Sequence, residues 1–150
     1  MLLKIHIDGA SRGNPGPSAS AAVIKNGEGH TVEEAGIFLG ERTNNYAEFC
    51  ALRLALSKAR ELAADELEIF SDSELLVRQY NGIYRVKKPA LAELMADIRA
   101  RASRFRKVSL SHVPRERNVQ ADALANRVLD SAKENPGKKT CPHTGQLEMF

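Results

Sequence analysis

Apolar and polar residues alternate through about the first 40 residues of the chain, the period-two pattern typical of β-strands. The alternation covers residues 3–8, about 18–25 and about 31–39. Residues 9–17 contain three glycines and two prolines, which predicts that the chain turns there and that the first strand ends at Asp8. Asn26-Gly27 is a hairpin dipeptide, so we expect an antiparallel meander of three strands.

The period then lengthens to three or four residues, which indicates amphipathic helices. Pro89 suits the first turn of one of these helices, and the side chain of Asn118 can cap another. We expect a helix over about 44–63, a strand over 67–70, a helix opened by Ser71-Asp72-Ser73, a helix from Pro89, a strand over 108–112 and a last helix after Asn118. The order βββαβα(α)βα predicts an α/β (α+β) fold in which helices flank a mixed sheet of five strands.

The composition adds a domain count and a charge to this picture. With 150 residues, 43% of them hydrophobic, the chain is long enough for one domain with a sizeable core. Periodicity stops beyond Ser131, so we expect a folded domain over 1–131 and a flexible tail over 132–150. The net charge of +3 tolerates a polyanionic partner without requiring one.

The expected location follows from the cysteines and the N-terminus. Cys50 and Cys141 are too few for a disulfide framework, which predicts free thiols in a reducing compartment. The N-terminus lacks the apolar region of a signal peptide, and no stretch approaches the length of a membrane span. We therefore expect a cytoplasmic protein without membrane contact, and a monomer by default.

Four acidic residues lie where the predicted elements begin or end. Asp8 and Asp72 end strands, while Glu48 and Asp122 lie in the first turns of helices. If they converge, their mutual repulsion raises one or more pKa values, and divalent cations relieve that repulsion. Each acid also has a simpler role: turn chemistry for Asp8, a capping box with Asn45 for Glu48, a helix cap for Asp72, and a solvated helix position for Asp122. Spacing alone leaves both readings open.

Four sequence blocks favour convergence. They are IDGASRGNPGP at 7–17, TNNYAEFCALRLAL at 43–56, IFSDSELLVRQ at 69–79 and VPRERNVQADALAN at 113–126. In this order, and on these elements, they resemble the type 1 ribonuclease H family, in particular its archaeal and bacterial branch that lacks a basic protrusion. The resemblance spans residues 1–131 and implies the ribonuclease H-like fold.

The resemblance implies hydrolysis of the RNA strand of RNA–DNA hybrids, leaving 5′-phosphate and 3′-hydroxyl ends. Asp8 would bridge two Mg²⁺ ions, with Mn²⁺ as a possible substitute; Glu48 and Asp72 would share one ion with it, and Asp122 the other. Arg115 is the expected helper, with His112 as the alternative. The competing functions are a nuclease of the same fold that cuts double-stranded RNA or DNA, and a catalytically silent hybrid-binding module.

The resemblance also names substrate contacts. Asn14, Asn44 and Asn45 would lie near the hybrid, and Thr43 would hold a DNA phosphate; helix capping is the alternative role for the asparagine pair. Some relatives carry arginine where this chain has Glu41. A further basic group is either a solvated helix face or a phosphate-binding surface: Arg99, Arg101, Arg104, Arg106 and Lys107.

The end of the tail carries a short motif of its own. Its residues resemble the peptide that binds the bacterial DNA sliding clamp: Gln146, Leu147, Met149 and Phe150. The alternative is that these apolar residues pack back on the chain's own domain.

Overall fold

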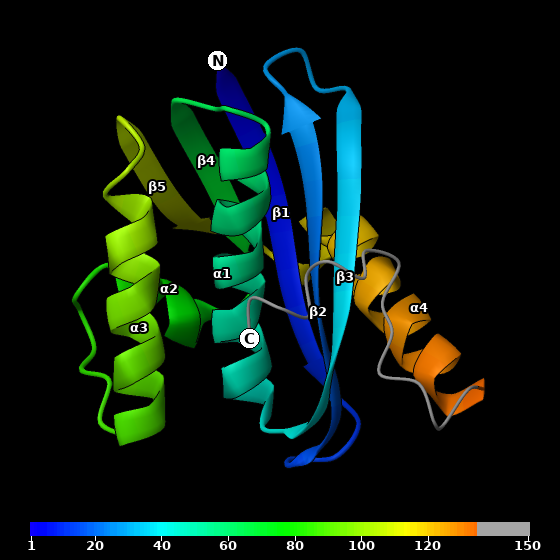
Figure 1. Ribbon diagram of the computed structural model, residues 1–150. Coiled ribbons are helices and arrows are strands. Elements are labelled where there is room, and N and C mark those ends of the chain that lie inside the picture. The colour runs from blue at the N-terminus through cyan, green and yellow to red at the C-terminus, as the bar shows by residue number, and fades with distance from the viewer. Residues whose placement is uncertain (135–150) are drawn as a thin grey trace.

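Five strands form one mixed sheet in the computed structural model, which describes residues 1–134 (Figure 1). The strands are β1 (Leu2–Ser11), β2 (Gly16–Asn26), β3 (Thr31–Arg42), β4 (Glu66–Ser71) and β5 (Lys107–His112). Their order across the sheet is β3-β2-β1-β4-β5. The first three pair antiparallel, whereas β4 and β5 extend the sheet parallel to β1. The predicted order and the mixed sheet are therefore confirmed.

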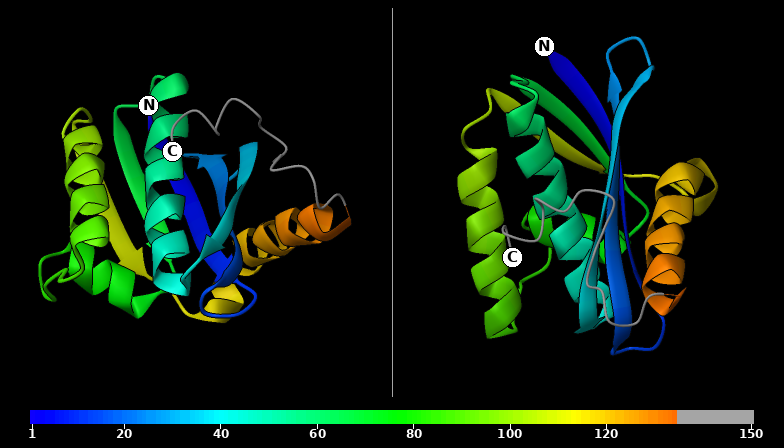
Figure 2. Two further views of the ribbon diagram at one scale, coloured as in Figure 1. Left: turned by 60° about the horizontal axis from the view of Figure 1, so that its bottom comes forward. Right: turned by 45° about the vertical axis from the view of Figure 1, so that its right-hand side comes forward.

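Helices cover both faces of the sheet (Figure 2). They are α1 (Asn44–Glu61), α2 (Glu74–Tyr80), α3 (Pro89–Ala102) and α4 (Val119–Glu134), with a short 3-10 turn, η1 (Arg115–Arg117), before α4. Helices α1 and α3 lie on one face, and α4 lies on the other (Figure 2). No helix among residues 1–134 is long and apolar enough to cross a membrane.

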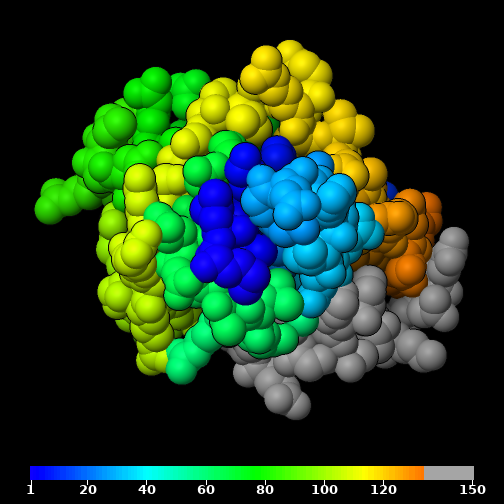
Figure 3. Space-filling view, turned by 90° about the horizontal axis from the view of Figure 1, so that it is seen from above, coloured from blue at the N-terminus to red at the C-terminus, as the bar shows by residue number. Residues whose placement is uncertain are grey.

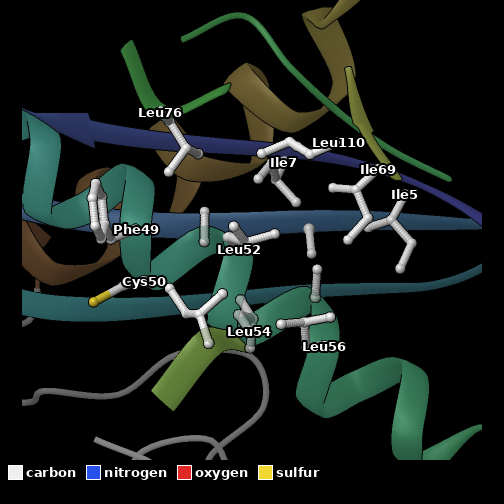
Figure 4. Packing of buried hydrophobic residues seen from close by; sticks show 14 of the residues in the cluster. Ile5, Ile7, Phe49, Cys50, Leu52, Leu54, Leu56, Ile69, Leu76 and Leu110 are labelled. Atoms are coloured by element: carbon white, nitrogen blue, oxygen red, sulfur yellow. The ribbon is translucent and has the colours of Figure 1, made fainter. Parts of the chain in front are cut away.

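The alternation along β1 divides its side chains between the two faces. Ile5 and Ile7 point into the larger core, where they meet Leu52 and other residues of α1 (Figure 4). Side chains of intervening residues, such as His6, face the α4 side, and His6 lines a cavity there with residues around the start of α4. Strand β1 therefore connects both layers of the molecule. Cys50 is buried in the larger core, and this burial raises the pKa of its thiol to about 12.

Two predicted boundaries are wrong at the end of the sheet where the acids lie. Strand β1 continues past Asp8 to Ser11, because its pairing with β2 runs on to Ser11 and Ser18. The glycines and prolines therefore produce a tighter turn than predicted, closed by a hydrogen bond from the Arg12 N–H to the Pro17 carbonyl at 2.8 Å. Helix α4 also runs to Glu134, past the last apolar position. The clamp-like residues Gln146, Leu147, Met149 and Phe150 lie outside the described residues.

The opposite end of the sheet gathers the N-terminus and the β2–β3 hairpin side by side (Figure 3). There the Met1 ammonium pairs with the Asp65 carboxylate at 2.6 Å. Both groups are largely exposed, so this ion pair contributes little stability.

Candidate metal centre

Asp8 lies in the middle of the sheet, one residue beyond the end of a parallel ladder. The pairing of β1 with β4 stops at Ile7 and Ser71, while the pairing with β2 continues. The prediction that Asp8 ends a strand is therefore wrong. Asp8 lies at the carboxyl end of the parallel part of the sheet. Asp8 is only 5% exposed to solvent. Ligands commonly gather at this edge of parallel sheets.

Glu48 reaches Asp8 because α1 crosses β1 at a glycine. A Cβ atom on Gly9 would overlap the backbone of Ala47 and Glu48, so only glycine permits this approach. The Gly9 N–H donates to Glu48 Oε1 at 2.6 Å, and the Ser20 hydroxyl donates to the Ala47 carbonyl at 2.7 Å. These two bonds fix the start of α1 on the sheet and aim the carboxylate of Glu48.

The capping role considered for Glu48 is wrong. Thr43 is the N-cap of α1, and its Oγ1 accepts the Tyr46 N–H at 3.1 Å. Glu48 lies beyond the first turn of the helix and binds Gly9 instead of the helix terminus. Its burial is therefore not explained by helix capping.

Asp72 follows β4 directly and is not the helix cap either. The N-cap of α2 is Ser73, whose Oγ accepts the Leu76 N–H at 3.2 Å. The Ser71 hydroxyl oxygen accepts the Ser73 N–H at 3.0 Å and so braces the turn around Asp72. The carboxylate of Asp72 is thereby placed beside that of Asp8.

The structure brings all four acids together. One oxygen atom from each of Asp8, Glu48 and Asp72 lies within 4.8 Å of the other two. Asp122, near the start of α4, lies close enough to Asp8 that its charge raises the pKa of the Asp8 carboxyl group. The cluster thus draws its members from strand β1, from the turn after β4 and from helices on opposite faces of the sheet.

The electrostatics of the cluster favour a bound cation. Burial, and then the charges of Asp72 and Asp122, raise the pKa of Asp8 to about 8. Burial, and then the charge of Asp8, raise the pKa of Glu48 well above its ordinary value. The hydrogen bond from the Gly9 N–H lowers this pKa, but by less. Carboxylate oxygens are the donors that hard divalent cations such as Mg²⁺ prefer. The donor set therefore fits a magnesium site.

Arg115 is the basic residue that acts on these carboxylates. It lies in η1, between β5 and α4, and its positive charge lowers the pKa values of both Asp8 and Glu48. His112 is exposed at the end of β5, where its backbone pairs with Ser71. Of the two candidate helpers, Arg115 is the one whose charge bears on Asp8.

The predicted substrate residues gather at the start of α1. Asn14 Oδ1 accepts the Asn44 N–H at 3.0 Å, so the turn after β1 is bound to the helix terminus. Thr43 caps the same helix, and the Arg42 guanidinium lies 5.0 Å from the centroid of the Tyr46 ring. The capping role considered for Asn44 and Asn45 is therefore wrong, because Thr43 caps α1 and Asn14 accepts the first N–H of the helix.

Most of the predicted basic group is bound within the protein. Arg99 donates to the carbonyls of Gln79 and Tyr80, at 3.3 and 2.9 Å. Arg101 pairs with Asp97, and Arg106 pairs with Glu66, both at 3.0 Å. These contacts favour the solvated helix face over a phosphate-binding surface for these three arginines.

Sequence reasoning missed two residues that build the site. Gly9 was counted only as part of a turn, although a glycine directly after a strand acid was a usable signal. Asn118 was predicted to cap α4 with its side chain, which is wrong: its Nδ2 donates to the Ile7 carbonyl at 2.8 Å. No local pattern could reveal this contact, because the two residues are 111 positions apart.

Replacing Gly9 by alanine tests the close approach of α1. We expect Gly9→Ala to lower the free energy of unfolding by about 1–3 kcal/mol, because the added methyl group forces α1 away from β1. Gly27→Ala is the control, since a Cβ there meets nothing within 4 Å. Urea denaturation measures both; equal stabilities of the two variants would contradict the assigned role of Gly9.

Comparisons with known proteins agree with this geometry. Residues 6–128 match the family described as reverse transcriptase-like. Ribonuclease HI of Halobacterium salinarum is 42% identical over 127 residues, which are 85% of this chain and 64% of that protein. The bifunctional protein Rv2228c of Mycobacterium tuberculosis is 40% identical over 143 residues, 95% of this chain and 39% of that protein. The chain thus spans less than two thirds of the length of these relatives.

Solved structures of similar proteins have the same fold as this chain. The crystal structure of RNase H1 from Halobacterium salinarum superposes with a TM-score of 0.86 at 41% identity, covering 88% of this chain and all of that one. LC11-RNase H1, solved in complex with an RNA/DNA hybrid, has a TM-score of 0.82 at 39% identity, covering 87% of this chain and 98% of that one. Since sequence and fold agree over most of its length, the chain belongs to the reverse transcriptase-like family, within its type 1 ribonuclease H branch.

Proposed function

We propose that this protein is an endonuclease that hydrolyses the RNA strand of RNA–DNA hybrids. The observation that carries the proposal is the carboxylate cluster, in which oxygens of Asp8, Glu48 and Asp72 approach within 4.8 Å of one another. Such a cluster suits phosphodiester hydrolysis assisted by divalent cations. The relative LC11-RNase H1 was solved with an RNA/DNA hybrid, which supports the same substrate class for this chain.

The arrangement of the acids supports a site for two Mg²⁺ ions, with Mn²⁺ as a substitute. Asp8 is central, because it is grouped with Glu48 and Asp72 and its pKa is also raised by the charge of Asp122. Asp8, Glu48, Asp72 and Asp122 would together hold the ions, with Asp8 as the shared ligand that the family resemblance implies. Bound cations lower the pKa of a water molecule and neutralise charge that develops on the phosphate and on the leaving oxygen.

The chain's own groups prepare the site for this chemistry. The raised pKa values of Asp8 and Glu48 favour the protonated carboxyl groups in the absence of a cation. Both groups would lose these protons when a cation binds to them. Arg115 holds a positive charge beside the cluster, where the scissile phosphate would lie. The water molecule loses a proton as its oxygen bonds to phosphorus, the bond from phosphorus to the 3′ oxygen breaks, and that oxygen takes up a proton. The products are a 5′-phosphate and a 3′-hydroxyl.

Recognition of RNA requires groups that bind a 2′-hydroxyl, which both donates and accepts hydrogen bonds. Asn14 accepts from Asn44 through Oδ1, which leaves its Nδ2 for the hybrid. Asn44 is exposed at the helix start, and the buried Oδ1 of Asn45 has no partner among the described residues. We assign these three amides to contacts with the hybrid near the cut.

Thr43 is assigned to a phosphate of the DNA strand. Its oxygen accepts the Tyr46 N–H, so its hydroxyl hydrogen remains available to donate to a phosphate oxygen. Arg42 lies next to it and is exposed, held over the Tyr46 ring. Arg42 thereby supplies a positive charge in the region where Glu41 replaces the arginine of some relatives.

Cleavage of labelled substrates tests the proposed function. With Mg²⁺, we expect cutting of the RNA strand of a hybrid but not of double-stranded RNA or DNA, and no cutting in EDTA. Asp8→Asn and Asp72→Asn should each lower the rate by more than about 100-fold, because both remove an oxygen ligand. The control is Glu93→Gln, which changes an exposed acid on α3 outside the cluster. Full activity of Asp8→Asn would refute the assignment.

We further propose that the last five residues bind the bacterial sliding clamp through Gln146, Leu147, Met149 and Phe150. Three apolar side chains and a glutamine suit insertion into a preformed groove on a partner. Deleting 146–150 should abolish capture by immobilised clamp and leave cleavage of short hybrids unchanged. Undiminished capture after this deletion would show that the motif is not the clamp-binding segment.

A further inference from the structure

One buried side chain joins α4 to β1 directly behind the carboxylates. Asn118 is 1% exposed, and its Nδ2 donates to the Ile7 carbonyl at 2.8 Å. Ile7 immediately precedes Asp8, and the Asp122 N–H donates to the backbone carbonyl of Asn118 at 3.1 Å. The side chain of Asn118 is therefore bonded to the residue before Asp8. Its backbone carbonyl is bonded to Asp122, one helical turn further along.

The hydrogen bond from Asn118 to Ile7 lies where repulsion between carboxylates acts on the start of α4. Asp8 and Asp122 raise each other's energy when both are ionised, and this repulsion tends to separate the start of α4 from β1. The apolar contact between α4 and the sheet in this region uses mostly small side chains, including Ala21, Ala121 and Ala125. A buried hydrogen bond across the same gap opposes the repulsion with fixed geometry.

The orientation of the Asn118 amide is set by chemistry. The Ile7 carbonyl only accepts hydrogen bonds, so the NH₂ group must face it and Oδ1 must face the other way. Oδ1 is buried and has no partner among the described residues, and the same holds for Nδ1 of His6. Both residues line one cavity of about 130 Å³, together with Lys25 and Gln120. This volume and this polar lining suit a few water molecules that connect the two atoms.

We propose that Asn118 is a positioning residue for the metal centre: it sets the spacing of Asp8 and Asp122, and thereby the affinity for divalent cations. This inference rests on the proposed metal centre. Asn118 bonds the backbone of the ligand-bearing segments and not the carboxylates themselves. Partners of this kind around metal sites typically change metal affinity by about 10- to 100-fold when they are removed.

Mg²⁺ binding measured by isothermal titration calorimetry tests the proposal. Asn118→Ala removes the donor, and Asn118→Asp keeps the shape of the side chain but places an oxygen against the Ile7 carbonyl. We expect both variants to bind Mg²⁺ at least about tenfold more weakly than the unmodified protein. Cleavage should fall steeply at limiting Mg²⁺ and recover in large part at saturating Mg²⁺. Should Asn118→Ala fail to fold, Asn118→Ser provides the same test with a smaller change in volume.

Two controls separate positioning from stability and from the metal site itself. Val128→Ala removes buried volume from the same helix, ten residues further along, and should lower Tm while leaving Mg²⁺ affinity unchanged. Asp8→Asn should abolish Mg²⁺ binding. If Asp8→Asn binds Mg²⁺ normally, the proposed metal centre is wrong. If Asp8→Asn loses binding while the Asn118 variants keep the original affinity and differ only in Tm, the positioning role of Asn118 is overturned.

Discussion

The repulsion among four neighbouring carboxylates, of which those of Asp8 and Glu48 are buried and that of Asp122 is exposed, is the constraint on which the rest of the site depends. Burial alone disfavours the charged form of Asp8, and the charges of Asp72 and Asp122 add to this effect. The pKa of Asp8 consequently lies near 8, and that of Glu48 is raised as well. With that pKa, Asp8 keeps its proton at neutral pH, so binding of a cation to this carboxylate would be coupled to loss of the proton.

The fold meets this constraint by bringing the acids in from separate, rigid elements. Asp8 lies on the central strand, while Glu48 and Asp122 come from helices on opposite faces of the sheet. Gly9 allows α1 to touch β1, and Asn118 bonds the start of α4 to the same strand. The apolar core beneath α1 gives these contacts their rigidity, since its large side chains are almost fully buried (Figure 4). The scaffold thereby holds the carboxylates together against their own repulsion.

Local patterns in the sequence predicted the elements well and their boundaries less well. Alternation and helical periodicity depend on neighbours a few positions apart, so the order of strands and helices followed from them. The extension of β1 to Ser11 did not, because it depends on pairing with Ser18 across the turn. The capping role considered for Glu48 failed for the same reason, since its partner is the backbone of Gly9, 39 positions away.

The site itself was predictable only as far as the four ordered blocks reached. They identified the four acids and the residues at the start of α1, but periodicity gave no reason for convergence. Asn118 was assigned to its nearest helix terminus, although its side chain bonds a strand 111 positions away. Contacts of this kind decide how closely the acids approach, and they become visible only when both segments are placed in space.

The dependence of stability on pH, measured with and without Mg²⁺, tests convergence most directly. Asp8 binds its proton more tightly in the folded protein, with a pKa of about 8 against an ordinary value of 3.8. In EDTA, the free energy of unfolding should therefore fall as the pH rises from about 5 to about 8, and Asp8→Asn should remove much of this fall. Saturating Mg²⁺ should suppress the fall, because cations replace the protons. A free energy of unfolding that stays level or rises over this range in EDTA would contradict a buried, converging carboxylate cluster.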